Sequence, residues 1–414
     1  MKILQPSECQ PATSIEKAEW RKYQRNVRQS MAAIPQSLQW IVTTITGKPL
    51  RPDEYSWPFP KWLDVLLTPL VALGAIMALV HLAQLENPTR WLGIVPLWLI
   101  LVGALRKIQV THLHHAIHNS LFDNPTLNQA YAAVMPQLIC VQNAQEYRRE
   151  HLAHHRLDIF TLQKDADAAF LAQLGFLPGR SRDELWLNLW MTVCSPVFHL
   201  VFAKARLGSM LLRNTPVGTG CAVLSVGAGL AIFAAVGWQA YLIAVLIPMF
   251  PLYHVSALLQ FLTEHAWNVT GKPVQGWEEY QQRCWGRFCG EPFPCPPADG
   301  MNNGIHHAVS IFRWCLRMLL LHLPVRLSCL VADLPAHDWH HLAHRAGQKS
   351  RDWYNSLTLR EQAIANGDIP GFATRELWGM ENMIEHQFCY LESLALRSRV
   401  LLHPRNLPLG NVAG

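Results

Sequence analysis

The sequence has few charged residues. Only 15% of its 414 residues are Asp, Glu, Lys or Arg and 50% are hydrophobic, whereas about a quarter of the residues in a typical soluble domain are charged. The net charge is a mild +6, and no Lys/Arg-rich run with interleaved aromatic side chains occurs. This composition argues against a nucleic-acid-binding protein and favours a membrane protein with sizeable polar loops.

Several common catalytic motifs are missing. The sequence contains no G-x-S-x-G, no H-E-x-x-H and no Gly-rich nucleotide loop before a helix, which argues against Ser hydrolases, zinc proteases and a bound nicotinamide or flavin. It also lacks the E-x-x-H pair with which soluble di-iron bundles bind their metals.

Paired cysteines are absent as well. The ten cysteines include no C-x-x-C pair, and the one cluster is Cys284, Cys289 and Cys295. Free thiols in a reducing compartment fit this pattern best. A zinc knot that includes His306 or His307 stays open, although its spacing matches no common zinc template.

A cleavable signal peptide is not found, because residues 1–60 are polar and basic with no apolar core. We interpret residues 1–60 as a cytoplasmic or interfacial segment. Residues 61–342 then form a membrane catalytic domain, and residues 343–414 form a cytoplasmic helical tail.

Long hydrophobic runs predict an all-α integral membrane fold with about four transmembrane helices in two hairpins. The expected spans are residues 62–85, 91–105, 217–238 and 241–262. Short connections within each hairpin and the placement of Lys and Arg put the N-terminus, residues 106–215 and the C-terminal third on the cytoplasmic face. These parts would form a cytoplasmic helical cap.

Two further apolar segments fit this scheme less simply. Residues 305–334 are broken by charged residues and a proline, so we expect helices that lie in the headgroup layer. Residues 186–202 are expected to be interfacial or re-entrant, but a total of five or six spans stays open if they cross.

Histidine, in contrast, is concentrated in three groups on the predicted cytoplasmic side. Each group follows a membrane exit or an interfacial helix. The groups are His114 and His118; His151, His154 and His155; and His337, His340 and His341.

The spacing in these groups suits a metal site. Residues three and four apart lie on one face of a helix, so their imidazoles can point to a common spot. Neutral imidazole suits iron, zinc and copper. Eight imidazoles are too many for one ion, and the sequence therefore predicts a two-metal centre.

The three histidine boxes resemble those of the integral-membrane fatty acid desaturase and alkane hydroxylase superfamily. In that superfamily the boxes bind two non-haem irons that use O2 to attack unactivated C–H bonds. The resemblance covers residues 112–344 and implies that the eight histidines are iron ligands.

A ninth ligand is expected between the fourth span and the third box. Residues 261–267, F-L-T-E-H-A-W, resemble the N-Y-x-E-H-Y-G motif of alkane hydroxylases but keep only its Glu and His. The resemblance implies that His265 is a ligand and that Glu264 supports a ligand through a hydrogen bond. Animal acyl-CoA desaturases match less well, because Phe261 stands where they carry Asn.

Acidic residues after the second box also resemble residues of the family. Asp165 and Asp167 could hold ligand histidines through the distal ring nitrogen, or could be solvated. We take Glu264 and Asp167 as candidate catalytic residues.

Other histidines are expected to lie outside the ligand set. His115 would face away from its neighbours on a helix, and His306 and His307 could face substrate or the membrane interface. The remaining histidines considered structural are His112, His322 and His344.

The resemblance implies an O2-dependent oxidoreductase acting on a fatty acyl or fatty acid chain, with desaturation as the first choice. Hydroxylation, as by a monooxygenase, and oxidative decarboxylation to a terminal alkene stay open. Electrons would come from a separate ferredoxin-like or rubredoxin-like protein. The expected location is a bacterial inner membrane, with the active site on its cytoplasmic face.

A different class stays open beside these enzymes, namely a His-rich membrane metal transporter or zinc-dependent receptor. The histidines, however, lie in polar segments rather than within the spans, where a conduction path would need polar residues.

Overall fold

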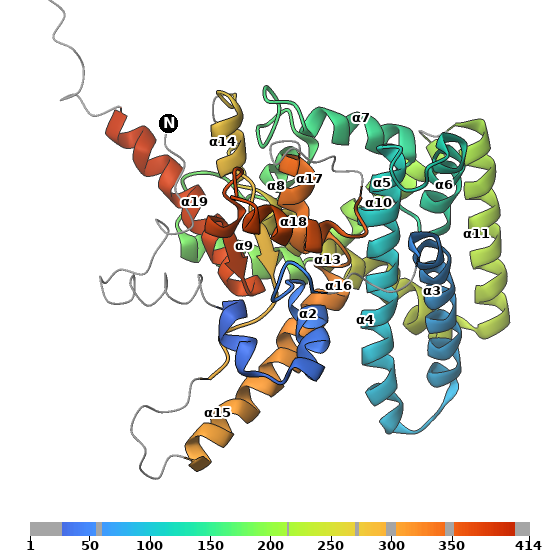
Figure 1. Ribbon diagram of the computed structural model, residues 1–414. Helices are drawn as coiled ribbons and strands as arrows, with labels where there is room; N and C mark the ends of the chain where they lie inside the picture. The colour runs from blue at the N-terminus through green and yellow to red at the C-terminus, as the bar shows by residue number, and fades with distance from the viewer. Residues whose placement is uncertain are drawn as a thin grey trace, which may run out of the picture.

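The computed structural model describes residues 27–54, 60–212, 215–269, 273–294, 304–343 and 352–401, with side chains as far as residue 394. Regular structure in these ranges is almost entirely helical (Figure 1). The two strands found there, β1 (Gly286–Phe288) and β2 (Glu376–Trp378), form a short parallel pair. The prediction of an all-α membrane fold is confirmed.

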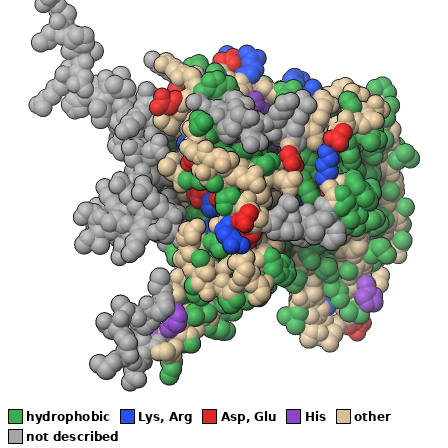
Figure 2. Space-filling model, viewed as in Figure 1, with side chains coloured by type: hydrophobic (Ala, Val, Ile, Leu, Met, Phe, Trp, Pro, Cys, Tyr) green, Lys and Arg blue, Asp and Glu red, His purple; other side chains and the backbone are tan. Residues whose placement is uncertain are grey.

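The first hairpin consists of α3 (Lys61–Gln84) and α4 (Trp91–Lys107), joined by the 3₁₀ turn Pro88–Arg90. The apolar helix α3 packs against α4 and against the start of the helix that begins at Trp238, and many of its other side chains are exposed. Met77, for example, is 65% exposed. Figure 2 shows hydrophobic side chains over the surface formed by α3, α4 and α11, as expected for lipid-facing helices.

A π-helical turn, Ile108–Leu113, continues α4 into the short helix α5 (His114–Ile117). Such turns are uncommon and often occur at functional sites. Here the turn lies directly before the first histidine box, so the chain leaves the span and enters the cap without a loop.

The second hairpin pairs α11 (Pro216–Val236) with a helix that runs from Trp238 to Glu264. This longer helix contains α12 (Trp238–Tyr241), two π segments and α13 (Tyr253–Glu264). Gly237 joins the two helices with a φ of +80°, which glycine adopts at little cost.

Five helices are long and apolar enough to cross a membrane, one more than the four that the sequence predicts. The additional helix runs continuously from Gly304 to Ser328 through α15 (Gly304–Arg317), a π turn and α16 (Leu323–Ser328). The charged residues that suggested a broken segment do not interrupt it. Its Arg317 forms an ion pair with Glu291 at 2.8 Å.

A sixth span would arise if the bent pair α9 (Arg182–Cys194) and α10 (Pro196–Leu212) crossed together, with a bend of 67°. The bend falls at Ser195–Pro196, where proline cannot donate the helical hydrogen bond. The structure is therefore compatible with five spans, or with six if the bent pair crosses the membrane.

The cap lies at one end of these helices. In Figure 1, α7 runs across the upper end of α4 and α5, and α17 and α18 lie beside it. The remaining helices of the described chain are α2 (Gln39–Thr46), α6 (Pro125–Leu138), α7 (Ala144–His154), α8 (Ala166–Gln173), α14 (Trp277–Gln282), α17 (His337–Leu342), α18 (Ser356–Ala365) and α19 (Met380–Leu401), with 3₁₀ turns at Met31–Ala33, Gln36–Leu38, Leu334–Ala336 and Phe372–Thr374.

A large core joins the cap to the spans. Buried side chains of α8, α9, α13 and α19 pack around Trp267 and Trp285. The strand pair extends this connection, because Gly286 pairs with Glu376 across 90 positions of sequence. The proposed domain boundaries at residues 60 and 342 stay a prediction.

Candidate metal centre

The first histidine box lies at the end of the α4–α5 helix. His114 is buried within α5, and His118 ends that helix one turn later. Both rings therefore face the cap from the membrane side.

The second box is positioned by α7. The side chain of Asn143 caps this helix by accepting a hydrogen bond from the Glu146 N–H at 3.0 Å. His151 and His154 are buried in the last turn, and His155 ends the helix. The predicted helical spacing in this box is therefore present.

The third box occupies the six-residue helix α17. His337 and His341 are one turn apart and buried, and His340 lies between them on the same side. Asp338 points instead toward α18, where Arg360 donates to both of its carboxylate oxygens at 2.9–3.1 Å. This ion pair fixes the rotation of α17, because both side chains are fully buried.

The single histidine after the second hairpin is also brought into the cap. Helix α13 ends at Glu264, and the backbone of His265 is extended and forms an antiparallel bridge with Cys284. Nδ1 of His265 lies 3.3 Å from the Arg283 carbonyl oxygen.

All nine predicted histidines converge, and their ring nitrogens form two neighbouring sets. The first set consists of His114, His118, His151, His155 and His340. The second set consists of His154, His265, His337 and His341, together with the carboxylate of Glu264. The rings of His155 and His341 stack at 4.4 Å between the two sets.

The distances within each set fit a shared cation. Nε2 of His340 lies 3.0 Å from Nε2 of His114 and 3.1 Å from Nε2 of His155. In the second set, Nε2 atoms of His154 and His265 are 3.2 Å apart. Two nitrogen ligands at a right angle, each about 2.1 Å from one ion, lie about 3.0 Å apart.

Hydrogen bonding alone does not account for these contacts. A neutral imidazole nitrogen offers one N–H or one lone pair, yet Nε2 of His340 meets two other ring nitrogens. Nε2 of His118 is buried and has no hydrogen-bond partner among the described residues. A metal ion in each set would satisfy these nitrogens.

The electrostatics of the cap also favour metal binding. Burial holds the pKa values of His151, His155, His340 and His341 well below the usual range, and neighbouring imidazoles lower them further. Burial likewise lowers the pKa of His118 to about 3. These rings are therefore neutral at physiological pH, as metal ligands must be.

Polar groups orient the ligand rings from behind. Asp165 accepts from His154 Nδ1 at 2.7 Å, and the hydroxyl of Tyr280 lies 2.6 Å from Nδ1 of His341. Burial alone would lower the pKa of His154, but the charges of Asp165, Asp167 and Glu264 and the hydrogen bond to Asp165 raise it to about 9. Without a metal this ring therefore carries a proton at neutral pH, which a metal would displace, and the Asp165 carboxylate makes the deprotonated ring a stronger ligand.

Glu264 lies closer to the metal position than the sequence suggests. Its Oε1 is 3.0 Å from Nε2 of His337, the nitrogen that also faces His341. Its Oε2 accepts from Gln260 Nε2 at 2.8 Å. The carboxylate therefore stands among the ligand atoms of the second set, with His265 and His337.

Asp167 and Asp165 have different positions. Asp165 is buried and hydrogen-bonded to His154, whereas Asp167 is half-buried and lines a cavity beside the second set. Burial and the charge of Asp165 raise the pKa of Asp167 to about 8. Of the two acidic residues, Asp165 is the one that orients a predicted ligand.

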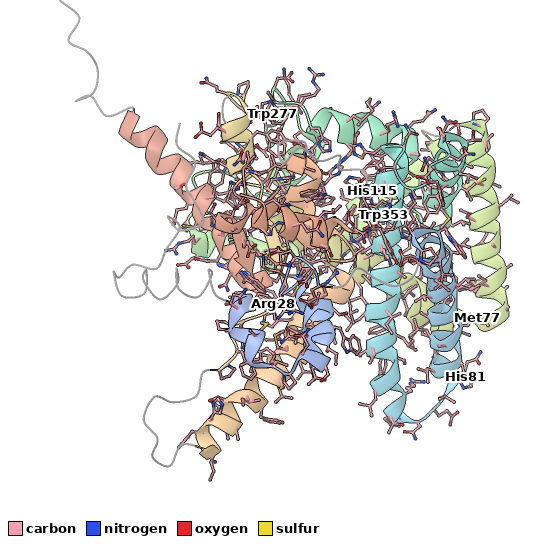
Figure 3. All side chains as sticks on the ribbon, viewed as in Figure 1. Arg28, Met77, His81, His115, Trp277 and Trp353 are labelled. Atoms are coloured by element: carbon pink, nitrogen blue, oxygen red, sulfur yellow. The ribbon has the colours of Figure 1, made fainter. Side chains whose placement is uncertain are left out.

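Histidines outside the two sets have other partners. Nε2 of His115 lies 2.9 Å from Asp333, and its ring stacks on Trp353 at 5.5 Å (Figure 3). His112 lies 3.1 Å from Asp64. Sequence reasoning did not foresee Asp333, and a single Asp more than 200 positions away carries no spacing signal.

The remaining candidates do not join the centre. His306 and His307 begin α15 and belong to no cluster of converging ligand atoms in the described chain. Cys284 and Cys289 are buried free thiols. Cys295 and His344 lie outside the described residues.

A cavity of about 740 Å³ is lined by Asp167, whose carboxylate lies within 4.8 Å of a ring nitrogen of His154, a member of the second set. None of the nine histidines lines this cavity. Its walls come from α8, α9, α10 and α13 and include Phe170, Phe198, Phe202 and Phe261. Polar residues of α4 and α7 line another part, and Asp167 lies on the wall as well. The cavity can therefore hold an apolar chain, and Asp167 connects it to the second set.

A family model described as fatty acid desaturase matches residues 89–291. The match includes the first two boxes and the Glu264–His265 pair, and the third box folds onto the same ligand sets. The chain belongs to the fatty acid desaturase family. No curated protein matches the sequence.

Fatty acid desaturases of this kind are O2-dependent di-iron oxidoreductases, which confirms the prediction of an enzyme. The family also implies a fatty acyl substrate. The nitrogen-rich ligand sets fit the family's di-iron site, and the apolar helices fit an integral membrane protein.

Proposed function

We propose that this desaturase-family chain introduces a double bond into a fatty acyl chain at the cytoplasmic face of a membrane. The observation that supports this most directly is the convergence of nine histidines in two sets, together with a cavity of aromatic and aliphatic walls that Asp167 connects to the second set. In the balanced reaction, one CH2–CH2 unit, O2, two electrons and two protons give one CH=CH unit and two waters.

Each set would hold one iron. His114, His118, His151, His155 and His340 would bind the first, and His154, His265, His337, His341 and Glu264 would bind the second. When bound, the two irons supply the O2-dependent oxidation of an unactivated C–H bond.

The protein itself would position the chain and exclude water. Phe170, Phe198 and Phe202 offer rigid apolar surface along the cavity, so an acyl chain gains free energy by leaving water. Asp167 on the cavity wall, with its raised pKa, can hold a proton near the second set at neutral pH.

Electrons would come from a separate ferredoxin-like or rubredoxin-like protein docking on the cytoplasmic side. Exposed basic residues of α7, including Arg148 and Arg149, lie over the second histidine box. A positive surface there suits an acidic carrier. The proposed location is a bacterial inner membrane.

Metal analysis and product analysis together test this proposal. Purified protein should contain about two irons per chain, and cells expressing it should accumulate an unsaturated acyl product. His154→Ala should abolish the product, because it removes a ligand of the second set. His306→Ala is the matched control, since His306 is exposed and distant from both sets.

The products distinguish the outcomes. Detection of a hydroxylated chain would mean that this site catalyses hydroxylation instead of desaturation. Detection of a terminal alkene would mean that it catalyses decarboxylation. A stoichiometric zinc or copper load without iron, or identical lipid profiles for wild type and His154→Ala, would contradict the proposal.

A further inference from the structure

Two buried arginines line the cavity from opposite helices. Arg106 lies in the last turn of α4 and is completely buried, and Arg206 on α10 is 4% exposed. A buried charge is costly unless an opposite charge accompanies it. Neither guanidinium forms an ion pair with a carboxylate of the described chain.

Arg206 is held by neutral groups only. It donates to the backbone oxygens of Cys140 at 2.6 Å and Met249 at 2.7 Å, and its guanidinium stacks on the Tyr253 ring at 4.2 Å. These contacts fix the side chain in place but leave its charge without a partner.

Arg106 has an unused donor. Its Nη1 donates to Gln109 Oε1 at 2.9 Å, and its Nη2 donates to Gln260 Oε1. Its Nε is buried and has no hydrogen-bond partner in the described part of the chain. The Tyr253 ring lies between the two arginines, 5.1 Å from the Arg106 guanidinium.

Gln260 stands between Arg106 and Glu264, an acid of the second set. The amide accepts from Arg106 through Oε1 and donates to Glu264 Oε2 through Nε2 at 2.8 Å. A neutral amide thus occupies the place where a counter-ion would stand. The positive charge of Arg106 stays available at the cavity wall.

Other acids on the cavity wall have partners of their own. Glu146 is hydrogen-bonded to Ser209, and Glu150 accepts from Gln142 at 2.6 Å and pairs with Arg149. Asp167 is a third acid on the cavity wall. The cavity therefore carries two buried arginines and three acidic side chains, and neither arginine forms an ion pair with any of the three.

We propose that Arg106 and Arg206 bind the carboxylate of a free fatty acid and so anchor the substrate at one end of the cavity. This inference rests on the proposed function and names the head group of the substrate. A carboxylate bound beside the two guanidinium groups would neutralise their buried charge. An acyl thioester or ester presents only a neutral carbonyl there and would leave the charge unbalanced.

An anchored head group also sets the position of oxidation. If the carboxylate is fixed at the arginines, the carbon that reaches the metals is determined by its distance from the carboxyl end. Lengthening the substrate would extend the methyl end along the apolar walls. The oxidised position should therefore be constant when counted from the carboxyl carbon.

Ligand binding tests the anchor without turnover. Wild-type protein in detergent is titrated with radiolabelled hexadecanoic acid, and unlabelled acid and its methyl ester compete. The acid should compete at least about tenfold better than the ester. Arg106→Gln should weaken binding of the acid by about tenfold or more and leave binding of the ester unchanged, whereas Arg106→Lys should retain part of the affinity.

Arg51→Gln is the matched control, because Arg51 is an exposed arginine near the N-terminus. Iron content is measured for every variant, so that a folding defect is recognised. Equal binding of acid and ester by the wild-type protein would overturn the anchor, even if Arg106→Gln failed to fold.

Turnover separates this inference from the proposed function. If iron-loaded protein oxidises hexadecanoyl-CoA but neither binds nor oxidises the free acid, the anchor is wrong and the desaturase proposal stands. If the free acid binds through Arg106 but no lipid is oxidised, the anchor stands and the proposed function is wrong. With acids of several chain lengths, a position constant from the methyl end would also overturn the anchor.

Discussion

Arg360 binds both carboxylate oxygens of Asp338, with nitrogen–oxygen distances of 2.9–3.1 Å and both side chains fully buried. Asp338 stands in the third histidine box, one residue after His337. The pair therefore links α18 to the short helix that carries three of the nine histidines. Six residues of helix are not stable alone, so this contact is needed to orient the rings.

Arg360→Ala should lower both iron content and stability. It leaves Asp338 buried without its partner, which costs about 3–5 kcal/mol. Iron analysis and thermal unfolding check this. Arg317→Ala removes an arginine from the exposed ion pair with Glu291 and should shift stability by less than about 1 kcal/mol. Full iron occupancy in Arg360→Ala would show that α17 is oriented by other contacts.

Eight of the nine converging histidines could be predicted from the sequence because each box is a local pattern, and His265 was expected from the resemblance of residues 261–267 to a family motif. Spacing of three and four residues on a helix brings rings such as His151 and His154 to one face whatever the rest of the fold does. The apolar runs were equally local, and four of the five candidate spans lie where the hydropathy predicts them.

The supporting contacts could not be predicted, because they join residues far apart in the chain. Tyr280 and His341 are 61 positions apart, and Arg106 and Gln260 are 154 positions apart. The spacing of residues in the sequence does not predict such pairs, because they form only when α4, α13 and the cap pack together. The continuous helix from Gly304 to Ser328 was missed because its sequence carries charged residues. Two of them find partners beyond the helix, Arg317 with Glu291 and Arg326 with the Ala332 carbonyl oxygen.

Asp165→Asn should weaken metal binding in the second set. Asn can still accept from the Asp167 N–H that caps α8, but it lacks the charge that holds His154 Nδ1–H. Loss of such a partner typically costs about 10–100-fold in metal affinity. Chelator competition monitored by iron release measures the change.

Asp158→Asn serves as the control for this variant, because Asp158 is exposed and pairs with Arg156. Asp158→Asn should release its iron at the same chelator concentration as the wild-type protein. Wild-type behaviour of Asp165→Asn would mean that His154 needs no charged partner.

His386 should make the metal-free protein less stable in acid. Burial lowers the pKa of His386 to about 4, below its usual value of about 6.5 in an unfolded chain. The unfolded state therefore binds the proton more tightly, so this contribution is full above about pH 6.5 and is lost as the pH falls toward 4. The effect is on the order of 3 kcal/mol.

Unfolding of metal-free wild type and His386→Phe between pH 7 and pH 4 measures that contribution. The variant should lose less stability across this range, because Phe cannot take up a proton. Parallel pH profiles for the two proteins would show that His386 does not titrate on unfolding.

Gly103 on α4 allows close contact with α16, and a side chain there should separate the two helices. A Cβ at this position would lie 1.9 Å from the backbone oxygen of Leu327, which cannot turn away as a flexible side chain could. Gly103→Ala should therefore destabilise the protein by about 1–3 kcal/mol or more in a thermal unfolding experiment. Gly74→Ala is the matched control, because a Cβ on Gly74 of α3 meets nothing within 4 Å. Both substitutions replace Gly by Ala within a helix and change helix propensity equally. A larger loss of stability in Gly103→Ala than in Gly74→Ala therefore measures the α4–α16 contact alone. Equal stability of the two variants would show that α16 can move away at no cost.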